Sequence, residues 1–184
     1  MNENLDSVVL AGGCFWCTEA DFQRFDGITE VKSGYTGGNI KNPAYREVCS
    51  GRTGHAEGVR ITYKPETIDF KSILEVFFAT HDPTTLNRQG NDVGTQYRSG
   101  IFYTTESQKQ EAETFIRFLE KERIFNDSIV TEITPLDVFY DAEVNHQEYY
   151  NLNKQQPYCQ FIITPKIEKI KKFYSDKLKA NGDI

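Results

Sequence analysis

Hydrophobic and polar positions in the first part of the chain follow two different periods. A short apolar run at Ser7–Ala11 ends in two glycines, and a proline-free segment with spaced apolar residues follows until Asp26 and Gly27. This pattern predicts a strand, a tight turn and a helix. Ile28–Ser33 has an extended pattern, and Gly58–Tyr63 alternates apolar with polar residues, so both are predicted strands.

The next segments complete a recognisable order of elements. Asp69–Ala79 carries apolar residues at spacings of three and four, which predicts an amphipathic helix, and Gly100–Thr104 is a further predicted strand. The order β, α, β, β, α, β is that of the split βαβ, or ferredoxin-like, arrangement, in which two helices pack on one face of a sheet. We therefore expect an α+β two-layer sandwich with long functional loops.

The C-terminal part adds helices and edge strands. Thr105 followed by Gln108 predicts a capping box that opens a long polar helix. Ile129–Ile133 and Val138–Tyr140 are predicted edge strands. Pro165 at a first helical position predicts a C-terminal surface helix with lysines on its outer side.

Length and charge narrow the class of protein. The 184 residues are the size of one domain, expected to span 1–184, with a core at about 7–160 and a helical tail at 161–184. The net charge of −6 argues against nucleic acid or an anionic membrane as a partner. No apolar stretch is long enough for a membrane helix, and the opening segment is acidic rather than signal-like. We expect a cytoplasmic monomer.

One of the four cysteines stands at the predicted strand-to-helix turn. Cys14 follows two glycines, which would place its sulfur at the positive end of the helix, where a thiolate is stabilised and the thiol pKa falls. The ordinary interpretation of a lone cysteine is a small buried residue. Cys17 completes a Cys-x-x-Cys pair, which favours redox chemistry. Because no second pair has zinc-site spacing, we expect no metal.

Five motifs in sequence order carry a resemblance to one family. They are Gly-Gly-Cys-Phe-Trp, Gly-Tyr-Thr-Gly-Gly, Tyr-Arg-Glu-Val, Gly-His-Ala-Glu and a Gln-Gly-Asn-Asp segment, at Gly12–Trp16, Gly34–Gly38, Tyr45–Val48, Gly54–Glu57 and Gln89–Ser99. From about Val8 to Cys159 the chain resembles the A-type peptide methionine sulfoxide reductases. Two long predicted loops, at 34–57 and 80–98, carry most of these motifs, as expected of loops that have a function.

The resemblance implies a reaction and a reductant. A thiol-dependent enzyme would reduce methionine S-sulfoxide, protein-bound or free, through a sulfenic acid on Cys14 and then a disulfide. Thioredoxin or another dithiol would restore the thiols, and no cofactor would be bound. The implied biological role is protein repair under oxidative stress.

The resemblance also implies roles for individual residues. Glu47 would be the acid that protonates the sulfoxide oxygen, provided that burial raises its pKa. Tyr35 and Tyr97 would donate hydrogen bonds to that oxygen, and Asp92 would orient a water or the substrate. Phe15 and Trp16 would form the pocket for the methyl group, and Tyr97 would also bind the substrate.

Regeneration of the nucleophile leaves two candidate thiols. Many family members have Gly at the position of Cys17 and two C-terminal cysteines, whereas this chain has one, Cys159. Cys159 is favoured as the resolving thiol because it follows Pro157 in a segment expected to be mobile. Cys17 is the alternative, or a relay partner, although helical geometry can misdirect its sulfur for a relaxed disulfide.

Two other functions stay open at this point. A thioredoxin-like disulfide oxidoreductase would use Cys14 and Cys17 as its redox pair. A non-catalytic module would bind methionine side chains through its aromatic residues.

Overall fold

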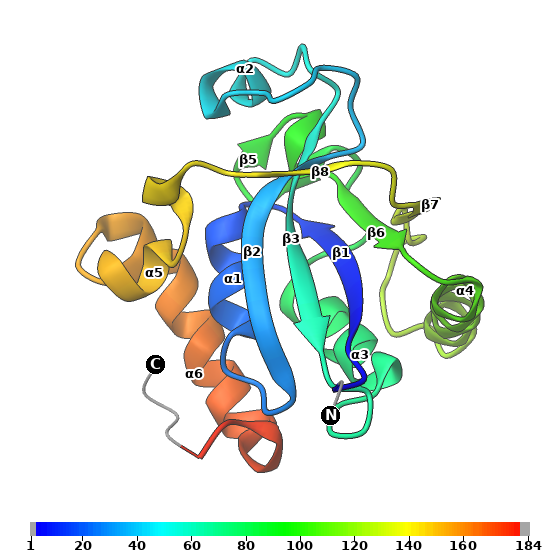
Figure 1. The fold of residues 1–184 in the computed structure, drawn as a ribbon. Helices are drawn as coiled ribbons and strands as arrows, with labels where there is room; N and C mark the ends of the chain where they lie inside the picture. The colour runs from blue at the N-terminus through cyan, green and yellow to red at the C-terminus, as the bar shows by residue number, and fades with distance from the viewer. Residues whose placement is uncertain (1–2, 181–184) are drawn as a thin grey trace.

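Six strands form one mixed sheet in the order β7-β6-β1-β3-β2-β8 (Figure 1). The structure is a computed structural model that describes residues 3–180. The sheet strands are β1 (Asp6–Gly12), β2 (Ile28–Thr36), β3 (Ala56–Tyr63), β6 (Ser99–Tyr103), β7 (Glu132–Pro135) and β8 (Phe139–Asp141). A separate small hairpin pairs β4 (Arg88–Gln89) with β5 (Asp92–Val93). The predicted strands are confirmed, and the two predicted edge strands lie at opposite edges of the sheet.

The strand pairing shows how the central elements connect. β1 pairs antiparallel with both β3 and β6, β2 pairs antiparallel with β3, and β6 pairs parallel with β7. Two helices, α1 (Phe15–Phe22) and α3 (Phe70–Thr80), connect strands of the central order β6-β1-β3-β2. The α+β class is therefore confirmed.

Four further α-helices complete the described chain, together with short turns of other helix types. The α-helices are α2 (Tyr45–Cys49), α4 (Glu106–Lys121), α5 (Tyr149–Leu152) and α6 (Thr164–Phe173). Three short 3-10 turns and one π-helical turn are η1 (Thr95–Tyr97), η2 (Val144–His146), η4 (Ser175–Lys177) and η3 (Cys159–Ile163). Within residues 3–180, no helix combines the length and the apolar character that crossing a bilayer requires.

Local capping explains where the long helices begin. Asp69 precedes α3 and its carboxylate accepts the N–H of Ser72 at 2.8 Å. Thr105 accepts the N–H of Gln108 at 3.2 Å, as predicted for the start of α4. The second half of the predicted box differs, because the Gln108 side chain accepts from the N–H of Thr104. α1 ends earlier than predicted, at Phe22, because the chain turns before Gly27.

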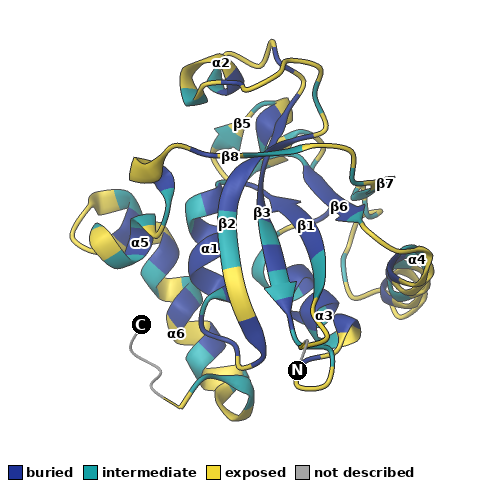
Figure 2. Ribbon diagram, viewed as in Figure 1, coloured by how far each residue is buried: buried dark blue, intermediate teal, exposed yellow. Residues whose placement is uncertain are grey.

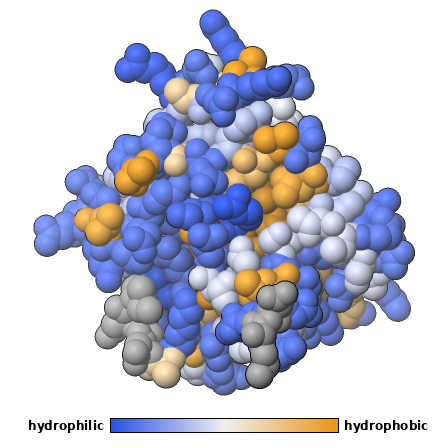
Figure 3. Space-filling view, in the orientation of Figure 1, coloured by the Kyte–Doolittle hydropathy of each residue, from blue (hydrophilic) through white to orange (hydrophobic). Residues whose placement is uncertain are grey.

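Both faces of the sheet are buried by other parts of the chain. Along β1, Val8 and Leu10 pack into the main core with α1 and α3, while Val9 and Ala11 face the other side. On that side Leu136 and the start of β8 cover the sheet, because the segment between β7 and β8 crosses it (Figure 1). Figure 2 shows the resulting buried β1 and β3 between more exposed elements, and Figure 3 shows an apolar area in the region of β1 and β6 on an otherwise mostly hydrophilic face.

The C-terminal helix lies against α1 as an amphipathic element. Ile167 and Ile170 of α6 are buried, and Ile167 shares a cluster with Cys17 and Ala20 of α1. Lysines occupy the outer side, as predicted. The regular helix ends at Phe173, and the last four residues of the predicted tail, 181–184, lie outside the described residues.

Candidate active site

The turn between β1 and α1 places Cys14 at the start of the helix. Gly13 has φ +95°, a backbone conformation that favours glycine, and an added Cβ would lie 2.6 Å from the side chain of Gln89. Both the backbone conformation and the lack of space therefore require glycine at this position. Cys14 is the N-cap of α1, and Phe15 is the first helical residue. The predicted position of the cysteine at a backbone bend is confirmed.

The two thiols of the Cys-x-x-Cys pair hydrogen-bond to each other and titrate together. The pKa of Cys14 is raised well above its usual value, first by burial and then by its hydrogen bond with Cys17. The pKa of Cys17 is lowered to about 7, chiefly because the Cys14 thiol hydrogen-bonds to its thiolate. The sequence predicted a lowered pKa for Cys14 itself. The structure does not support that prediction, because burial and the hydrogen bond with Cys17 both raise the pKa of Cys14.

Glu57 supplies a protonated carboxyl group beside the cysteine. It lies near the start of β3, is 1% exposed, and its Oε1 accepts the N–H of Phe15 at 3.2 Å. Burial raises the pKa of Glu57 to about 8, although the Phe15 hydrogen bond opposes that shift. The carboxyl therefore carries a proton at neutral pH.

Glu47 does not have the environment that its predicted role requires. Its side chain is exposed in α2, and its Oε2 accepts the N–H of Ala44 at 3.2 Å. A carboxylate at this position stabilises the first turn of a helix. The burial on which the predicted role of Glu47 depends is not present, because the short helix α2 turns this residue to solvent.

Two tyrosines lie close enough to the buried carboxyl for its charge to act on them. The pKa values of Tyr45 and Tyr97 are both raised, first by burial, and the charge of Glu57 acts on each. Tyr97 also experiences the charges of Asp92 and Cys14. Both phenols are therefore neutral, and the Tyr45 hydroxyl hydrogen-bonds to the Cys49 thiol. The structure brings the predicted pair Tyr97 and Asp92 to the neighbourhood of Cys14.

Tyr35 lies in the core beneath this cluster. It is fully buried in β2, and its hydroxyl donates to Glu143 at 3.0 Å. Its ring lies 5.7 Å from that of Phe15. The Tyr35 hydroxyl already donates its proton to Glu143, so it is not free to donate to a substrate oxygen as expected. Tyr35 instead packs beneath the site, against the ring of Phe15.

Aromatic side chains gather around the first turn of α1, where the sequence predicts the methyl pocket. Phe15 is buried, and Trp16 is half-exposed. The Trp16 ring stacks on Tyr149 at 3.7 Å, and its Nε1 donates to Nδ1 of His146 at 3.2 Å. His146 also lies 4.2 Å from the ring of Tyr45. An apolar group entering beside Cys14 would therefore meet a fixed aromatic surface.

Asp92 and Tyr158 connect the second long loop to the cysteines. Tyr158 donates to Oδ2 of Asp92 at 3.2 Å, and its hydroxyl lies 3.6 Å from Sγ of Cys17. These residues line a pocket of about 420 Å³ that also reaches Cys14 and Lys166. The pocket gives solvent and small reactants a route to both thiols.

Cys159 lies in packed structure. It begins the π-helical turn η3 and is 0% exposed, in a cluster with Cys17 and Ile163. The expectation that it occupies a mobile segment has no support in its packing.

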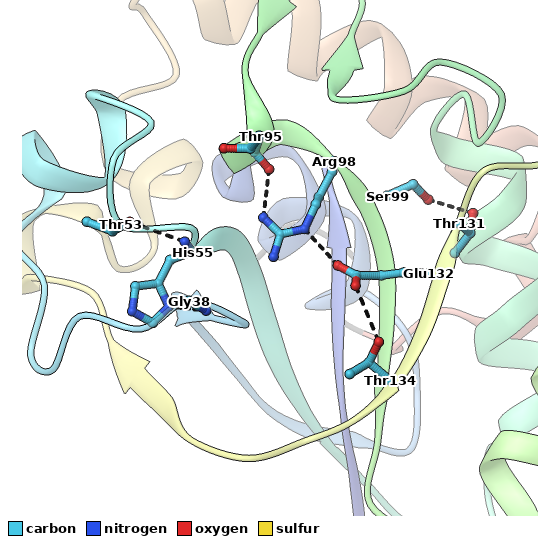
Figure 4. A network of polar contacts seen from close by, with 9 residues as sticks. All are labelled: Gly38, Thr53, His55, Thr95, Arg98, Ser99, Thr131, Glu132 and Thr134. Atoms are coloured by element: carbon cyan, nitrogen blue, oxygen red, sulfur yellow. Dashed lines mark hydrogen bonds and ion pairs between the residues drawn. The ribbon is translucent and has the colours of Figure 1, made fainter.

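Arg98 anchors the turn that carries Tyr97 (Figure 4). Its Nε lies 2.7 Å from Oε1 of Glu132 in β7, and its Nη1 donates to the carbonyl of Thr95 at 2.9 Å. Thr134 donates to the other Glu132 oxygen at 3.3 Å. The guanidinium thus ties η1 to the sheet and fixes the approach of Tyr97.

His55 performs a similar function for the first long loop. Its Nδ1 accepts the N–H of Gly38 at 3.0 Å (Figure 4). Its Nε2 donates to the carbonyl of Ile40 at 2.7 Å. These two hydrogen bonds close the loop before Tyr45, and His55 directly precedes the strand that holds Glu57.

Sequence reasoning missed Glu57 and Tyr45, although both lie in the quoted motifs. The available signal was position: Glu57 lies in a strand whose neighbours are apolar, so a carboxylate there is buried. Among residues 3–180, no group of three His, Cys, Asp or Glu side chains is arranged to hold a metal ion.

Comparisons with known proteins agree over almost the whole chain. Residues 6–178 match the family model described as peptide methionine sulfoxide reductase. The chain is 53% identical to peptide methionine sulfoxide reductase MsrA of Trichodesmium erythraeum, over 96% of this chain and 99% of that protein.

Solved structures give the same result for the fold. The reduced form of Mxr1 from Saccharomyces cerevisiae has a TM-score of 0.79 at 36% identity, over 84% of this chain and 89% of the other. Mxr1 in complex with Trx2 has a TM-score of 0.57 at 25% identity, over 81% of this chain and 89% of the Mxr1 chain.

Proposed function

The chain belongs to the peptide methionine sulfoxide reductase family, and from that premise we propose how its own residues carry out the reaction. The enzyme reduces methionine sulfoxide to methionine with thiol chemistry and is recharged by thioredoxin, as the complex of its relative with Trx2 supports. A disulfide oxidoreductase that uses only Cys14 and Cys17 is not favoured, since the family match spans residues 6–178.

The observation that carries the mechanism is the protonated carboxyl of Glu57 beside the N-cap cysteine. Cys14 Sγ attacks the sulfoxide sulfur while Glu57 donates its proton to the oxygen. The thiol proton of Cys14 returns to the Glu57 carboxylate. The oxygen ends on Cys14 as a sulfenic acid, two electrons have passed to the methionine sulfur, and methionine leaves.

Hydroxyl donors stabilise the oxygen as its negative charge grows. We propose Tyr45 and Tyr97 for this role, since both are neutral phenols near enough to Glu57 for its charge to raise their pKa values. Tyr45 thus takes the role expected of Tyr35, just as Glu57 takes that of Glu47. Asp92 acts indirectly, by holding the hydroxyl of Tyr158.

The aromatic surface selects the substrate. Phe15 and Trp16 receive the methyl group, and sulfur–aromatic contacts are worth about 0.3–1.5 kcal/mol each. The rigid stack of Trp16 on Tyr149 fixes one side of the pocket, so only one arrangement of oxygen and methyl points the oxygen at Glu57. We propose that this arrangement belongs to the S epimer, in protein-bound or free methionine.

We propose four broader assignments with the same function. The chain is a single reductase domain and monomer, and its central strand order β6-β1-β3-β2 supports the ferredoxin-like class. A thiol enzyme that depends on thioredoxin works in a reducing compartment, which supports the cytoplasm. Its role there is protein repair under oxidative stress. No metal or bound cofactor takes part.

A single-turnover experiment tests the function. Protein without reductant is mixed with a peptide that contains methionine S-sulfoxide or R-sulfoxide, and released methionine peptide is counted. We expect release from the S epimer only, and none from Cys14→Ser. Cys49→Ser is the matched thiol control and keeps wild-type release. Release by Cys14→Ser would reject the mechanism, and binding without any release by the wild type would favour a non-catalytic module.

A further inference from the structure

Glu19 is a buried carboxyl on α1 to which the reaction assigns no step. It lies one turn after Trp16 on the same face of the helix and is 1% exposed. An acidic side chain is rarely buried unless hydrogen bonds satisfy its oxygens. The partners of Glu19 therefore indicate its role.

Three donors bind the Glu19 carboxyl. The hydroxyl of Ser33 in β2 donates to Oε2 at 2.9 Å. The backbone N–H groups of Glu148 and Tyr149, at the start of α5, also hydrogen-bond to it. Burial raises the pKa of Glu19 to about 7, the charge of Glu148 raises it further, and the three hydrogen bonds oppose that shift. Because every partner donates, the carboxylate is the form that accepts all three hydrogen bonds.

The chain bends sharply where it meets Glu19. Glu148 has φ +52°, a left-handed backbone conformation that residues other than glycine rarely adopt. Such a conformation persists where the surrounding structure determines it. The hydrogen bonds from Glu148 and Tyr149 to Glu19 contribute to that determination, so α1 fixes both the bend and the start of α5.

The bend carries aromatic side chains that hold Trp16. The Tyr149 ring stacks on Trp16, and Nδ1 of His146 accepts from the Trp16 indole at 3.2 Å. α5 lies beside α1 (Figure 1), and its first residue contacts α1 twice, through its ring with Trp16 and through its N–H with Glu19. A displaced bend would therefore change one wall of the methyl pocket.

A second attachment lies just before the bend. The Gln147 side chain accepts the N–H of Ser33 at 3.0 Å and donates to the Ser33 carbonyl at 2.8 Å. It also donates to the carbonyl of Ala142 at 3.0 Å. Gln147 thus attaches the preceding segment to β2, whereas Glu19 attaches residues 148–149, the bend itself.

We propose that Glu19 is a positioning residue for substrate selection, because its carboxylate holds the bend at 148–149 and so keeps the Trp16–Tyr149 stack in the orientation that accepts the methyl group of one sulfoxide epimer. The proposal rests on the reductase function and on the assignment of Trp16 to the methyl pocket, both argued above. Glu19 is buried beneath this wall and acts through the two rings rather than on the substrate.

Fluorescence tests the wall without any substrate, because Trp16 is the only tryptophan of the chain. In Glu19→Gln the amide NH₂ group faces donors that a carboxylate accepts, so the bend should loosen. We expect acrylamide quenching of Trp16 at pH 8 to rise about twofold, since one face of the indole loses the cover of Tyr149. Ser33→Ala removes one donor of the three and should give a smaller rise.

Single turnover with the two sulfoxide epimers tests selection. For the S epimer, the apparent dissociation constant should rise in Glu19→Gln by up to about tenfold, the change expected for loss of one sulfur–aromatic contact. The maximal rate should change less, because Cys14 and Glu57 lie outside the bend. Release of methionine from the R epimer, which the wild type is expected to leave unreacted, should become measurable.

Two control variants separate positioning from a general loss of stability. Glu30→Gln changes an exposed glutamate of β2, and Leu119→Ala shortens a buried side chain of α4. Leu119→Ala should lower the urea midpoint of unfolding. Neither control should alter the quenching of Trp16 or the preference for the S epimer.

Defined outcomes overturn the proposal while the reductase function stands. It is overturned if folded Glu19→Gln keeps either the wild-type quenching or the wild-type affinity and epimer preference, or if Leu119→Ala shows the same changes. If Glu19→Gln does not fold, unchanged quenching and preference in Ser33→Ala overturn it. If the wild type releases no methionine from either epimer, the reductase function itself fails, which the other outcomes do not imply.

Discussion

The carboxyl of Glu57 accepts the backbone N–H of Phe15 at 3.2 Å and is thereby held against the first turn of the helix that Cys14 caps. A free N–H at a helix start would stabilise a carboxylate. Burial has the larger effect here, and it raises the pKa of Glu57 to about 8. The hydrogen bond therefore acts mainly to orient a proton donor.

Replacing the two glutamates separates their roles. Glu57→Gln should slow sulfenic acid formation by about 10²- to 10⁴-fold, because an amide cannot deliver the proton. Glu47→Gln should leave that rate within about twofold, since its carboxylate is exposed and only caps α2. Rapid-quench counting of methionine peptide measures both rates. A slow Glu47→Gln beside a normal Glu57→Gln would reverse the assignment.

The pH dependence of the chemical step should report the Glu57 proton. The acid acts only while it is protonated, and its pKa in the free enzyme is about 8. We therefore expect kcat/KM to fall as the pH rises through about 8, tenfold for each further unit. In Glu57→Gln this falling limb should vanish from the residual activity. If kcat/KM of the variant still falls above pH 8, the titration of another group causes the fall, and Glu57 is not the acid that it reports.

Stability should depend on pH through the same carboxyl. Between its ordinary value of 4.5 and about 8, Glu57 holds a proton in the folded protein and lacks it in the unfolded chain. The folded state binds more protons, so the unfolding free energy falls as pH rises across that window. The wild type should lose a few kcal/mol relative to Glu57→Gln between pH 4.5 and 8. Urea titrations at several pH values measure this difference, and parallel curves would contradict the buried protonated carboxyl.

The sequence sufficed for the sheet and for the cysteine turn because both depend on local pattern. Alternation in β3 and the double glycine before Cys14 act over a few residues, and tertiary contacts agree with them. Local pattern does not predict which of the two glutamates, Glu47 or Glu57, is buried. Both stand in motifs of the same loop, and only the packing of α2 and β3 decides which carboxyl is desolvated.

The pKa of Cys14 has a similar explanation. A helix N-terminus is visible in the sequence, but the hydrogen bond with Cys17 and the burial under α6 are tertiary facts. The position of Cys159 is also tertiary, because a proline two residues earlier indicates a turn and says nothing about packing. Long-range contacts therefore determine both which carboxyl is buried and where Cys159 lies.

The three tyrosines should differ in what their loss changes. Tyr45→Phe and Tyr97→Phe should each lower the rate of the chemical step about tenfold or more, because a donor to the developing charge is lost. Tyr35→Phe removes the hydrogen bond to Glu143 and should lower stability by about 1 kcal/mol. Its single-turnover rate should stay near that of the wild type. A large rate loss in Tyr35→Phe at unchanged stability would show that Tyr35 does donate a hydrogen bond to the substrate oxygen.

Arg98 should affect catalysis without touching the substrate. Its guanidinium binds Glu132 at 2.7 Å and the Thr95 carbonyl at 2.9 Å, so one planar group holds both β7 and the turn that carries Tyr97. A lysine has a single ammonium that cannot span both partners, so Arg98→Lys should loosen η1. We expect the maximal rate of the chemical step to fall severalfold with only about 1 kcal/mol of lost stability. Combining Arg98→Lys with Tyr97→Phe provides the decisive comparison. If Arg98 acts through Tyr97, the double variant should be no slower than Tyr97→Phe alone, and fully additive losses would show that Arg98 acts by another route.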